Sequence, residues 1–300
     1  MDDQKVGQGS TLGFIGLGRL GAPIARNLIA DGYQVIGFDQ SSQALADLAR
    51  SGGRAAKSAA EVGSGSAVVF TCVRTKDDLT AVLTGPDGLL AGLPSGSAVL
   101  DLSTMAPDAS AKHAHTIEAA GSEFLRVAVS GSAPAAAARQ ISFLCSGPLP
   151  LYERVAPLFE ALGRGHVHVG TSDEARSVKI AINMLVGVGM AAMVEAVTLA
   201  DGLGIDRRQF LEAVEQSAVG SPFVSAKVSA LADRDYTPTA SLALMLKDLD
   251  LALAAGGDIE QRLPVTELAR NLYARCQDRG WAERDFACLA ELYDSPADLP

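Results

Sequence analysis

The sequence predicts an α/β domain with a doubly wound sheet, followed by an all-helical C-terminal domain. Three observations lead to this prediction. Short apolar runs alternate with helical patterns from residue 11 to about residue 171, a glycine-rich turn follows the first run, and strand-like runs stop after Ser172. Strands and helices in alternation are typical of a largely parallel sheet with helices on both faces. We therefore expect one domain over residues 1–172 and a second over 173–300.

Seven apolar runs in the first domain have the length and composition of strands. They cover 12–16, 34–39, 67–73, 97–103, 123–129, 141–147 and 166–170. The helical patterns between most of them cover 20–30, 43–51, 76–83, 109–120 and 151–162. In the second domain, breaks rich in Gly and Pro separate the expected helices. These helices are the long one from 173, then 206–216, 221–231, 239–255, 264–279 and 283–293.

The long helix at the junction of the domains carries an unusual polar pair. Apolar residues recur at spacings of three and four from 175 to 203, so we expect this helix to be buried. Lys179 and Asn183 are four residues apart and therefore emerge from the same face. Burying an ammonium group without a partner is expensive. The segment 180–200 is apolar enough to be mistaken for a membrane span, but it contains Asn183 and Glu195, and a buried soluble helix explains it better.

The composition is that of a soluble globular protein. The chain has 300 residues, of which 48% are hydrophobic and 20% charged. A formal net charge of −10 argues against a surface that binds nucleic acid. The first ten residues lack the apolar core of a signal peptide, so we expect a cytoplasmic protein without a membrane partner. Four widely spaced cysteines are expected to be reduced thiols, namely Cys72, Cys145, Cys276 and Cys288.

The glycine-rich turn predicts a dinucleotide site. Residues 16–21, GLGRLG, fit G-x-G-x-x-G between an expected strand and an expected helix. Glycines at these positions allow a tight turn and close approach of the backbone to a pyrophosphate, which lies at the positive end of the helix. The sequence therefore predicts a Rossmann-type first domain. The residues expected at the cofactor are Gly16, Leu17, Gly18, Arg19, Leu20 and Gly21.

An acidic residue at the end of the second strand indicates the type of cofactor. Asp39 lies about twenty residues after the turn, where a carboxylate accepts hydrogen bonds from the ribose hydroxyls and repels a 2′-phosphate. No arginine follows in the next residues, so we expect NAD rather than NADP. The other interpretation is that Asp39 caps the next helix, although Ser41 or Ser42 can do so instead. We also expect Gln40, Val73 and Arg74 to contact the cofactor.

Several motifs together resemble the β-hydroxyacid dehydrogenase family, which includes 3-hydroxyisobutyrate dehydrogenase and tartronate semialdehyde reductase. The resemblance extends over nearly the whole chain. It is carried by the glycine motif at 13–33, DLSTMAP at 101–107, the segment 127–147 with SGS in its first part, KIAIN at 179–183 and MLKDLDLAL at 245–253. Separate motifs in the right order are much more specific than the glycine turn alone. The resemblance implies a homo-oligomer through the helical domain.

The resemblance also implies roles for individual residues. Thr104 would lie beside the nicotinamide ribose, and Ser130, Gly131 and Ser132 would hold the carboxylate of a small hydroxy acid. Asn183 would help to orient this substrate. Lys247 would add a positive charge near the substrate carboxylate and would also contact the cofactor. We expect Lys179 to be the general acid/base, because apolar neighbours and a nearby cation lower the pKa of a lysine. The expected reaction is hydride transfer between NAD and a 3-hydroxyisobutyrate-like acid.

Departures from the family pattern leave the substrate open. Arg126 and Ala128 stand where the family usually has an acid and a proline, Ser132 replaces the second glycine, and Ala240 replaces an aromatic residue. Two alternatives therefore remain, an imine reductase-like enzyme and a non-catalytic nucleotide-binding protein. Imine reductases usually lack the lysine, and a mere binding protein gains nothing from a buried cation. The histidine pairs at 113 and 115 and at 166 and 168 lack further ligands, so we expect no metal.

Overall fold

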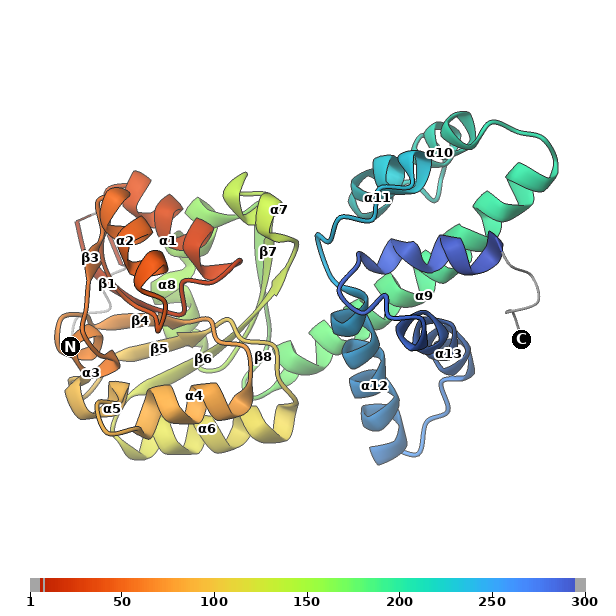
Figure 1. The fold of residues 1–300 in the computed structure, drawn as a ribbon. Helices are drawn as coiled ribbons and strands as arrows, with labels where there is room; N and C mark the ends of the chain where they lie inside the picture. Colours follow the sequence, from red (N-terminus) through yellow and green to blue (C-terminus); the bar gives the residue numbers. More distant parts are fainter. Residues whose placement is uncertain (1–5, 8, 295–300) are drawn as a thin grey trace. The chain divides into compact units, whose positions relative to one another are not determined.

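The computed structural model describes residues 6, 7 and 9–294 and divides the chain into two compact units, Met1–Lys179 and Ile180–Pro300. The first unit is an α/β domain and the second consists of helices (Figure 1). The predicted fold class is therefore confirmed. The division falls inside the long helix, so the first turn of that helix, with Lys179, belongs to the first unit.

The first unit is built on an eight-stranded sheet of order β3-β2-β1-β4-β5-β6-β7-β8. All neighbouring strands are parallel except β6 and β7. Neither this antiparallel pair nor the two-residue strand β3 was predicted from the sequence. The strands are β1 (Thr11–Ile15), β2 (Gln34–Phe38), β3 (Arg54–Ala55), β4 (Val68–Thr71), β5 (Ala98–Asp101), β6 (Glu123–Ser130), β7 (Ser142–Ser146) and β8 (Gly165–Gly170).

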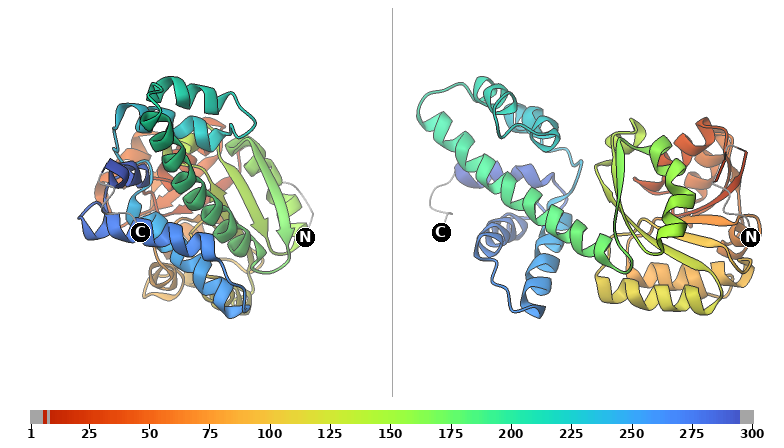
Figure 2. Two further views of the ribbon diagram at one scale, coloured as in Figure 1. Left: turned by 90° about the vertical axis from the view of Figure 1, so that its right-hand side faces the viewer. Right: turned by 180° about the vertical axis from the view of Figure 1, so that it is seen from behind.

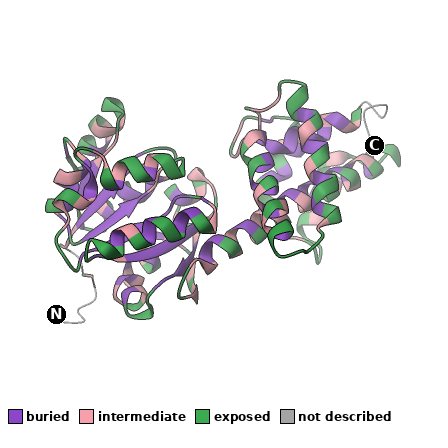
Figure 3. Ribbon diagram, turned by 90° about the horizontal axis from the view of Figure 1, so that it is seen from below, coloured by how far each residue is buried: buried purple, intermediate pink, exposed green. Residues whose placement is uncertain are grey.

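Helices cover both faces of this sheet (Figures 1 and 2). The strands are buried between them, while the outer sides of the helices are exposed (Figure 3). One face packs against α1 (Gly21–Ala30), α2 (Ser42–Arg50), α7 (Ala133–Ala137) and α8 (Leu149–Leu162). The other packs against α3 (Ala59–Ser64), α4 (Lys76–Thr84), α5 (Leu89–Gly92) and α6 (Pro107–Ala119). Helices α3, α5 and α7 are too short for a helical period to be read from the sequence.

The second unit has its own apolar core, to which every one of its helical elements contributes. The last element was expected to be an α-helix over 283–293, but it is a 3₁₀ helix, η1. The N–H of Cys288 donates to the main-chain oxygen of Asp285 three residues before it, which is the tighter 3₁₀ bond. The elements are α9 (Glu174–Gly202), α10 (Arg207–Glu215), α11 (Pro222–Asp233), α12 (Leu242–Asp258), α13 (Pro264–Asp278) and η1 (Phe286–Asp294).

The long helix α9 is buried on one side only. Met190, Val194 and Val197 lie in the core of the second unit, but Leu185 and Leu199 are each 65% exposed. The expectation that this helix is buried therefore holds for one side of it only. Among the described residues, α9 alone is long and apolar enough to span a membrane by composition. Core helices can pass the same test, and residues of α9 lie in the apolar core of the second unit.

Candidate active site

The glycine-rich turn lies where β1 ends and α1 begins. Gly16 has a φ of +92°, and a Cβ there would lie 2.2 Å from the main-chain oxygen of Cys72, so only glycine fits. A Cβ on Gly21 would lie 2.0 Å from the oxygen of Gly16, which lets α1 pack closely on the strand. A Cβ on Gly18 would meet no atom within 4 Å. Gly18 thus faces open space, as the approach of a pyrophosphate requires.

Asp39 is held at the end of β2 by two main-chain donors. Its Oδ2 accepts from the N–H of Leu17 at 2.7 Å, and its Oδ1 accepts from the N–H of Ser41 at 2.8 Å. A carboxylate has about four acceptor positions, so these bonds orient Asp39 without using up its capacity. Ser41 itself caps α2, accepting from Ala44. The capping function considered for Asp39 is therefore carried out by Ser41.

A cavity of about 450 Å³ extends along the carboxyl ends of β1, β2 and β4. Parallel sheets bind ligands at this edge. Cys72 lies in its wall, where burial first and the charge of Asp101 second raise the pKa of the thiol to about 12. Six of the residues expected at the cofactor line this one cavity, namely Gly16, Gly18, Asp39, Gln40, Val73 and Arg74.

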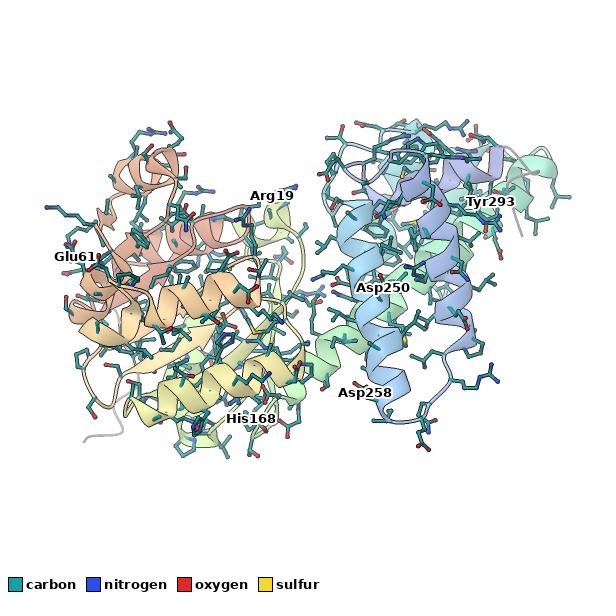
Figure 4. All side chains as sticks on the ribbon, turned by 60° about the horizontal axis from the view of Figure 1, so that its bottom comes forward. Arg19, Glu61, His168, Asp250, Asp258 and Tyr293 are labelled. Atoms are coloured by element: carbon teal, nitrogen blue, oxygen red, sulfur yellow. The ribbon has the colours of Figure 1, made fainter. Side chains whose placement is uncertain are left out.

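The other expected cofactor residues do not line the cavity. Leu17, Leu20 and Gly21 belong to the same turn and to the start of α1, and Thr104 lies exposed on the segment after β5. Arg19 lies exposed on the same turn, at the surface of the first unit (Figure 4). No described side chain caps the N-terminus of α1. The positive end of this helix dipole is thus available to an anion.

Several parts of the cavity wall were missed from the sequence, among them Asp78, Ala81 and Val82 of α4. Two further segments are residues 57–59, at the start of α3, and residues 85–88, between α4 and α5. A capping box was the available signal for the first segment, because Ser58 accepts from the N–H of Glu61 three residues later. The second segment has no comparable pattern, since its position depends on how α4 and α5 pack.

The expected substrate loop follows β6 in the first unit. Ser130 is the last residue of β6, and Ser132 caps the short helix α7 by accepting from Ala135 at 3.4 Å. Gly131 has a φ of +142°, and a Cβ there would lie 2.6 Å from Cγ2 of Ile141. The loop therefore requires glycine at its centre. The side chain of Asn27 on α1 donates to the oxygen of Ala136 in α7 at 2.9 Å, so the loop is tied to the helix that follows the glycine turn.

Lys179 lies on α9 in the first unit and is partly buried. It follows Arg176 by three residues, so both side chains project from neighbouring positions on one face of the helix. Arg176 is buried against the residues that follow β5. The helix that carries Lys179 is thus anchored next to segments that line the cavity. The lowered pKa expected for Lys179 stays a prediction.

In the second unit, Asn183 is oriented by an acid whose part in the site the sequence did not predict. Its Nδ2 donates to Oδ2 of Asp248 on α12 at 2.7 Å. The side chain of Asp248 is only 7% exposed, whereas that of its neighbour Lys247 is 45% exposed. The Lys247 Nζ lies 3.1 Å from Asp248 Oδ1. Asp248 thus connects two expected site residues. Its place in the motif MLKDLDLAL was the signal available in the sequence.

His166 and His168, one of the two histidine pairs in the sequence, form ordinary hydrogen bonds in the first unit. His166 Nδ1 lies 2.6 Å from the hydroxyl of Tyr152, and His168 Nε2 lies 2.9 Å from the oxygen of Gly147. Within residues 6, 7 and 9–294, no group of three His, Cys, Asp or Glu side chains is arranged to hold a metal ion. His166 and His168 are not among the residues that line the cavity.

The chain matches two family models in the order of its domains. Residues 11–170 match the NAD binding domain of 6-phosphogluconate dehydrogenase. Residues 174–293 match the model described as NAD-binding of NADP-dependent 3-hydroxyisobutyrate dehydrogenase. The two matches meet at the start of α9, where the sheet ends and the helical part begins.

Known relatives match over nearly their whole length. The NAD-dependent L-serine dehydrogenase and the 3-hydroxyisobutyrate dehydrogenase of Pseudomonas aeruginosa are each 33% identical to this chain, over 94% of it and over 97% and 98% of their own lengths. A solved structure of Mycobacterium tuberculosis 3-hydroxyisobutyrate dehydrogenase with L-serine is 28% identical, with a TM-score of 0.84. That match covers 95% of this chain and 99% of the other.

Proposed function

Because this chain belongs to the β-hydroxyacid dehydrogenase family and is an NAD(P)-dependent oxidoreductase of hydroxy acids, we propose that it oxidises a small β-hydroxy acid of the 3-hydroxyisobutyrate or L-serine type, with Lys179 as general acid/base. The observation that carries this proposal is a glycine-lined cavity in the same compact unit as Lys179. Hydrogen bonds connect Arg176, three residues before Lys179 on α9, through Asp101 and Ser103 to Val73, which lines this cavity.

The cavity fits a nicotinamide dinucleotide. Gly18 leaves open space at the turn, the N-terminus of α1 favours a pyrophosphate, and Asp39 presents a held carboxylate to ribose hydroxyls. When bound, the nicotinamide accepts the hydride from the carbon that bears the substrate hydroxyl. The protein's own part is to hold the substrate in line and to remove the hydroxyl proton.

In this proposal, Lys179 takes the hydroxyl proton during oxidation and returns it during reduction. A base positioned in this way contributes about 10²- to 10⁴-fold to the rate. The substrate carboxylate would be held by N–H and hydroxyl groups of Ser130, Gly131 and Ser132. Asn183, held by Asp248, would orient the substrate with its remaining donor and acceptor. Lys247 would supply a further charge.

The direct test is turnover of a panel of hydroxy acids with NAD. The panel contains 3-hydroxyisobutyrate, L-serine, glycerate and L-threonate, with tartronate semialdehyde and NADH for the reverse direction. Lys179→Ala is expected to lower kcat at least about 100-fold on the best substrate. Lys112→Ala, which removes an exposed lysine of α6, is the matched control and should leave kcat unchanged. Full turnover by Lys179→Ala would refute the assignment of the base.

The same assays separate the two alternatives. Turnover of cyclic imines with no turnover of any hydroxy acid would favour an imine reductase-like enzyme. Calorimetric binding of NAD without turnover of any panel member would favour a nucleotide-binding protein.

We further propose that NAD is preferred to NADP, because the carboxylate of Asp39 would repel a 2′-phosphate. Lys57 and Arg74 line the same cavity and act in the opposite sense, so Asp39 is the residue to change. In the wild type, kcat/KM is expected to be at least about tenfold higher with NAD. Asp39→Asn should reduce that ratio mainly by improving the KM for NADP. An unchanged ratio would contradict this assignment.

We also propose that the protein forms homo-oligomers through the helical unit. Leu185 and Leu199 are each 65% exposed, and their spacing of 14 residues places them on one side of α9. Leu203, which directly follows the helix, is 69% exposed. Exposed apolar stripes of this kind mark association surfaces. Sedimentation velocity should show an oligomer that Leu199→Glu weakens, whereas Glu212→Gln on α10 should not. A wild-type monomer at micromolar concentration would refute the proposal.

A further inference from the structure

The first turn of α9 is held by an unusual amount of buried charge. Arg176 has a side chain that is 1% exposed, and it forms an ion pair with Asp101, whose side chain is fully buried. Arg126 on β6 forms a second pair with Asp173, just before the helix, with 5% and 14% of these side chains exposed. All four residues lie in the first unit. Buried charges are costly to desolvate, so an arrangement of two such pairs calls for a reason.

Arg176 uses its donors to hold main-chain atoms as well as a carboxylate. It donates to the main-chain oxygen of Ser103 at 2.5 Å, to the main-chain oxygen of Asp101 at 3.2 Å and to Oδ2 of Asp101 at 2.5 Å. Its Nε lies 3.4 Å from the hydroxyl of Ser110 on α6. A planar guanidinium offers five donors in a fixed fork from three nitrogens, whereas a lysine offers three donors from a single nitrogen. The helix is therefore attached to the segment after β5.

Asp101 extends this attachment to the cofactor cavity. Its Oδ1 accepts from the hydroxyls of Thr71 and Ser103, each at 2.7 Å. The Ser103 hydroxyl in turn accepts from the N–H of Val73 at 3.0 Å, and Val73 lines the cavity. A continuous chain of hydrogen bonds thus runs from Arg176 through Asp101 and Ser103 to the cavity wall. Ser103 also precedes Thr104, the residue expected beside the nicotinamide ribose.

A third contact restrains the start of α9 from β7. The hydroxyl of Ser146 donates to the main-chain oxygen of Ser172 at 2.7 Å and accepts from the N–H of Ala175 at 3.0 Å. Together with the two ion pairs, it fixes the axial position and the rotation of the first turn. Lys179 is three residues beyond Arg176, which is about 4.5 Å along the helix axis. Any movement of Arg176 is therefore transmitted to Lys179.

We propose that Arg176 is a positioning residue, which sets the place of Lys179 relative to the wall of the cofactor cavity at Val73 through its bonds to Asp101 and Ser103. This inference rests on the proposed function, in which Lys179 is the base. A displacement of about 1 Å of a reacting group can cost about 100-fold in rate. The glycine turn and Asp39 lie outside this network, so we expect the affinity for NAD to change little when Arg176 is replaced.

The central variant is Arg176→Lys, which keeps a cation beside Asp101 but lacks the separate nitrogens with which Arg176 contacts Ser103 and Asp101. We expect kcat on the best hydroxy acid to fall about 10- to 100-fold. The Kd for NAD, measured by calorimetry, should stay within about threefold. Arg154→Met is the matched control. It removes a partly buried arginine that pairs with Glu123, the first residue of β6, and it should leave kcat unchanged. Wild-type kcat in Arg176→Lys would overturn the proposal.

A second variant covers the case in which Arg176→Lys does not fold, as judged by circular dichroism and thermal unfolding. The double substitution Asp101→Asn with Arg176→Gln removes both charges together and leaves no buried ion unpaired. The proposal predicts a cooperatively folded protein that binds NAD normally and has a similarly reduced kcat. A folded double variant with wild-type kcat would overturn it.

A double-mutant cycle separates positioning of Lys179 from a general structural effect. In the Lys179→Ala background, measured by single turnover with excess enzyme, Arg176→Lys should change the residual rate less than about twofold, because the group that it positions is gone. If Arg176→Lys lowers the residual rate by the same factor as in the wild type, Arg176 acts otherwise and the proposal fails. Full turnover by Lys179→Ala alone refutes the proposed function instead.

Discussion

Each unit contains a buried acid–base pair, and the two pairs differ in the part that the cation plays. In the first unit both members are centres: Arg176 bonds to a carboxylate, two main-chain oxygens and a hydroxyl, and Asp101 accepts from Thr71 and Ser103 as well as from Arg176. In the second unit the acid is the centre: Asp285 accepts from Lys227 at 2.6 Å and from main-chain and hydroxyl donors of Thr239, Ala240 and Ala287. Lys227 contributes one charge above the ring of Phe286.

This difference follows from what each pair has to connect. Two of the partners of Arg176 are the carbonyl oxygens of Asp101 and Ser103, and the five donors of a guanidinium can reach both of them together with the carboxylate of Asp101. Asp285 lies directly before η1 and close to the residues that precede α12. The main-chain N–H groups of these two segments need an acceptor, which the carboxylate of Asp285 provides. For the second unit, the comparison predicts that loss of the central residue costs more than loss of its partner.

The largest effect is expected from Asp285→Ala. Lys227 has a side chain that is only 7% exposed and would be left without its carboxylate, and the donors of Thr239, Ala240 and Ala287 would lose their acceptor. The free energy of unfolding should fall by about 3–5 kcal/mol. Urea unfolding followed by the fluorescence of Trp281, the single tryptophan of the chain and a residue of the second unit, measures it.

The matched substitution Lys227→Met tests which residue is central. It leaves Asp285 with all its N–H and hydroxyl donors, so the loss at neutral pH should be smaller, about 1–3 kcal/mol. Equal losses for Lys227→Met and Asp285→Ala would show that the charge pair alone matters, and the contrast drawn between the two units would then fail.

The acid limb of stability is expected to depend on the same pair. Burial opposes the ionisation of Asp285, but the hydrogen bond and charge of Lys227 and the N–H of Ala287 outweigh it and lower the pKa of the carboxyl. Its contribution is therefore complete above about pH 4, the ordinary range of an aspartate, and is lost as the pH falls through the lowered value. In Lys227→Met, acid unfolding of the second unit should begin at a higher pH, as Trp281 fluorescence against pH would show. An unchanged acid midpoint would contradict it.

The smallest effect concerns the thiols, which report opening of each unit separately. Burial raises the pKa of Cys288 to about 12, as it does for Cys72 in the first unit, so both should react slowly with iodoacetamide at pH 8. In Asp285→Ala, labelling of Cys288 should increase several-fold while that of Cys72 should not, as measured by peptide mass spectrometry. Equal increases at both thiols would mean that the two units do not open independently.

Much of the fold could be predicted because it depends on local patterns. Every long strand and helix of the first unit follows an apolar period, and the breaks of the second unit are marked by Gly and Pro. The parts that were missed are short or held by distant contacts. The strand β3 has two residues, and η1 has 3₁₀ geometry in a segment where Asp285 holds the N–H of Ala287.

The candidate site was predictable where neighbouring residues of one motif fix the local backbone conformation. The glycines of the turn were found because a positive φ at Gly16 and close packing at Gly21 exclude other residues. The chain of bonds from Arg176 to Val73 had no such signal. Arg176 and Asp101 are 75 residues apart in the sequence, and Ser103 and Val73 are 30 residues apart. Single Asp, Arg and Ser residues at such separations form no local pattern.

The sequence by itself determined the family, the order of the two domains, the dinucleotide turn and the lysine on the long helix. Each of these depends on residues close together in the chain or on motifs that keep their order. Only the tertiary structure decided how that helix is anchored, which acid orients Asn183, and which side of α9 is exposed. These depend on distances between side chains that come together only when the strands and helices pack.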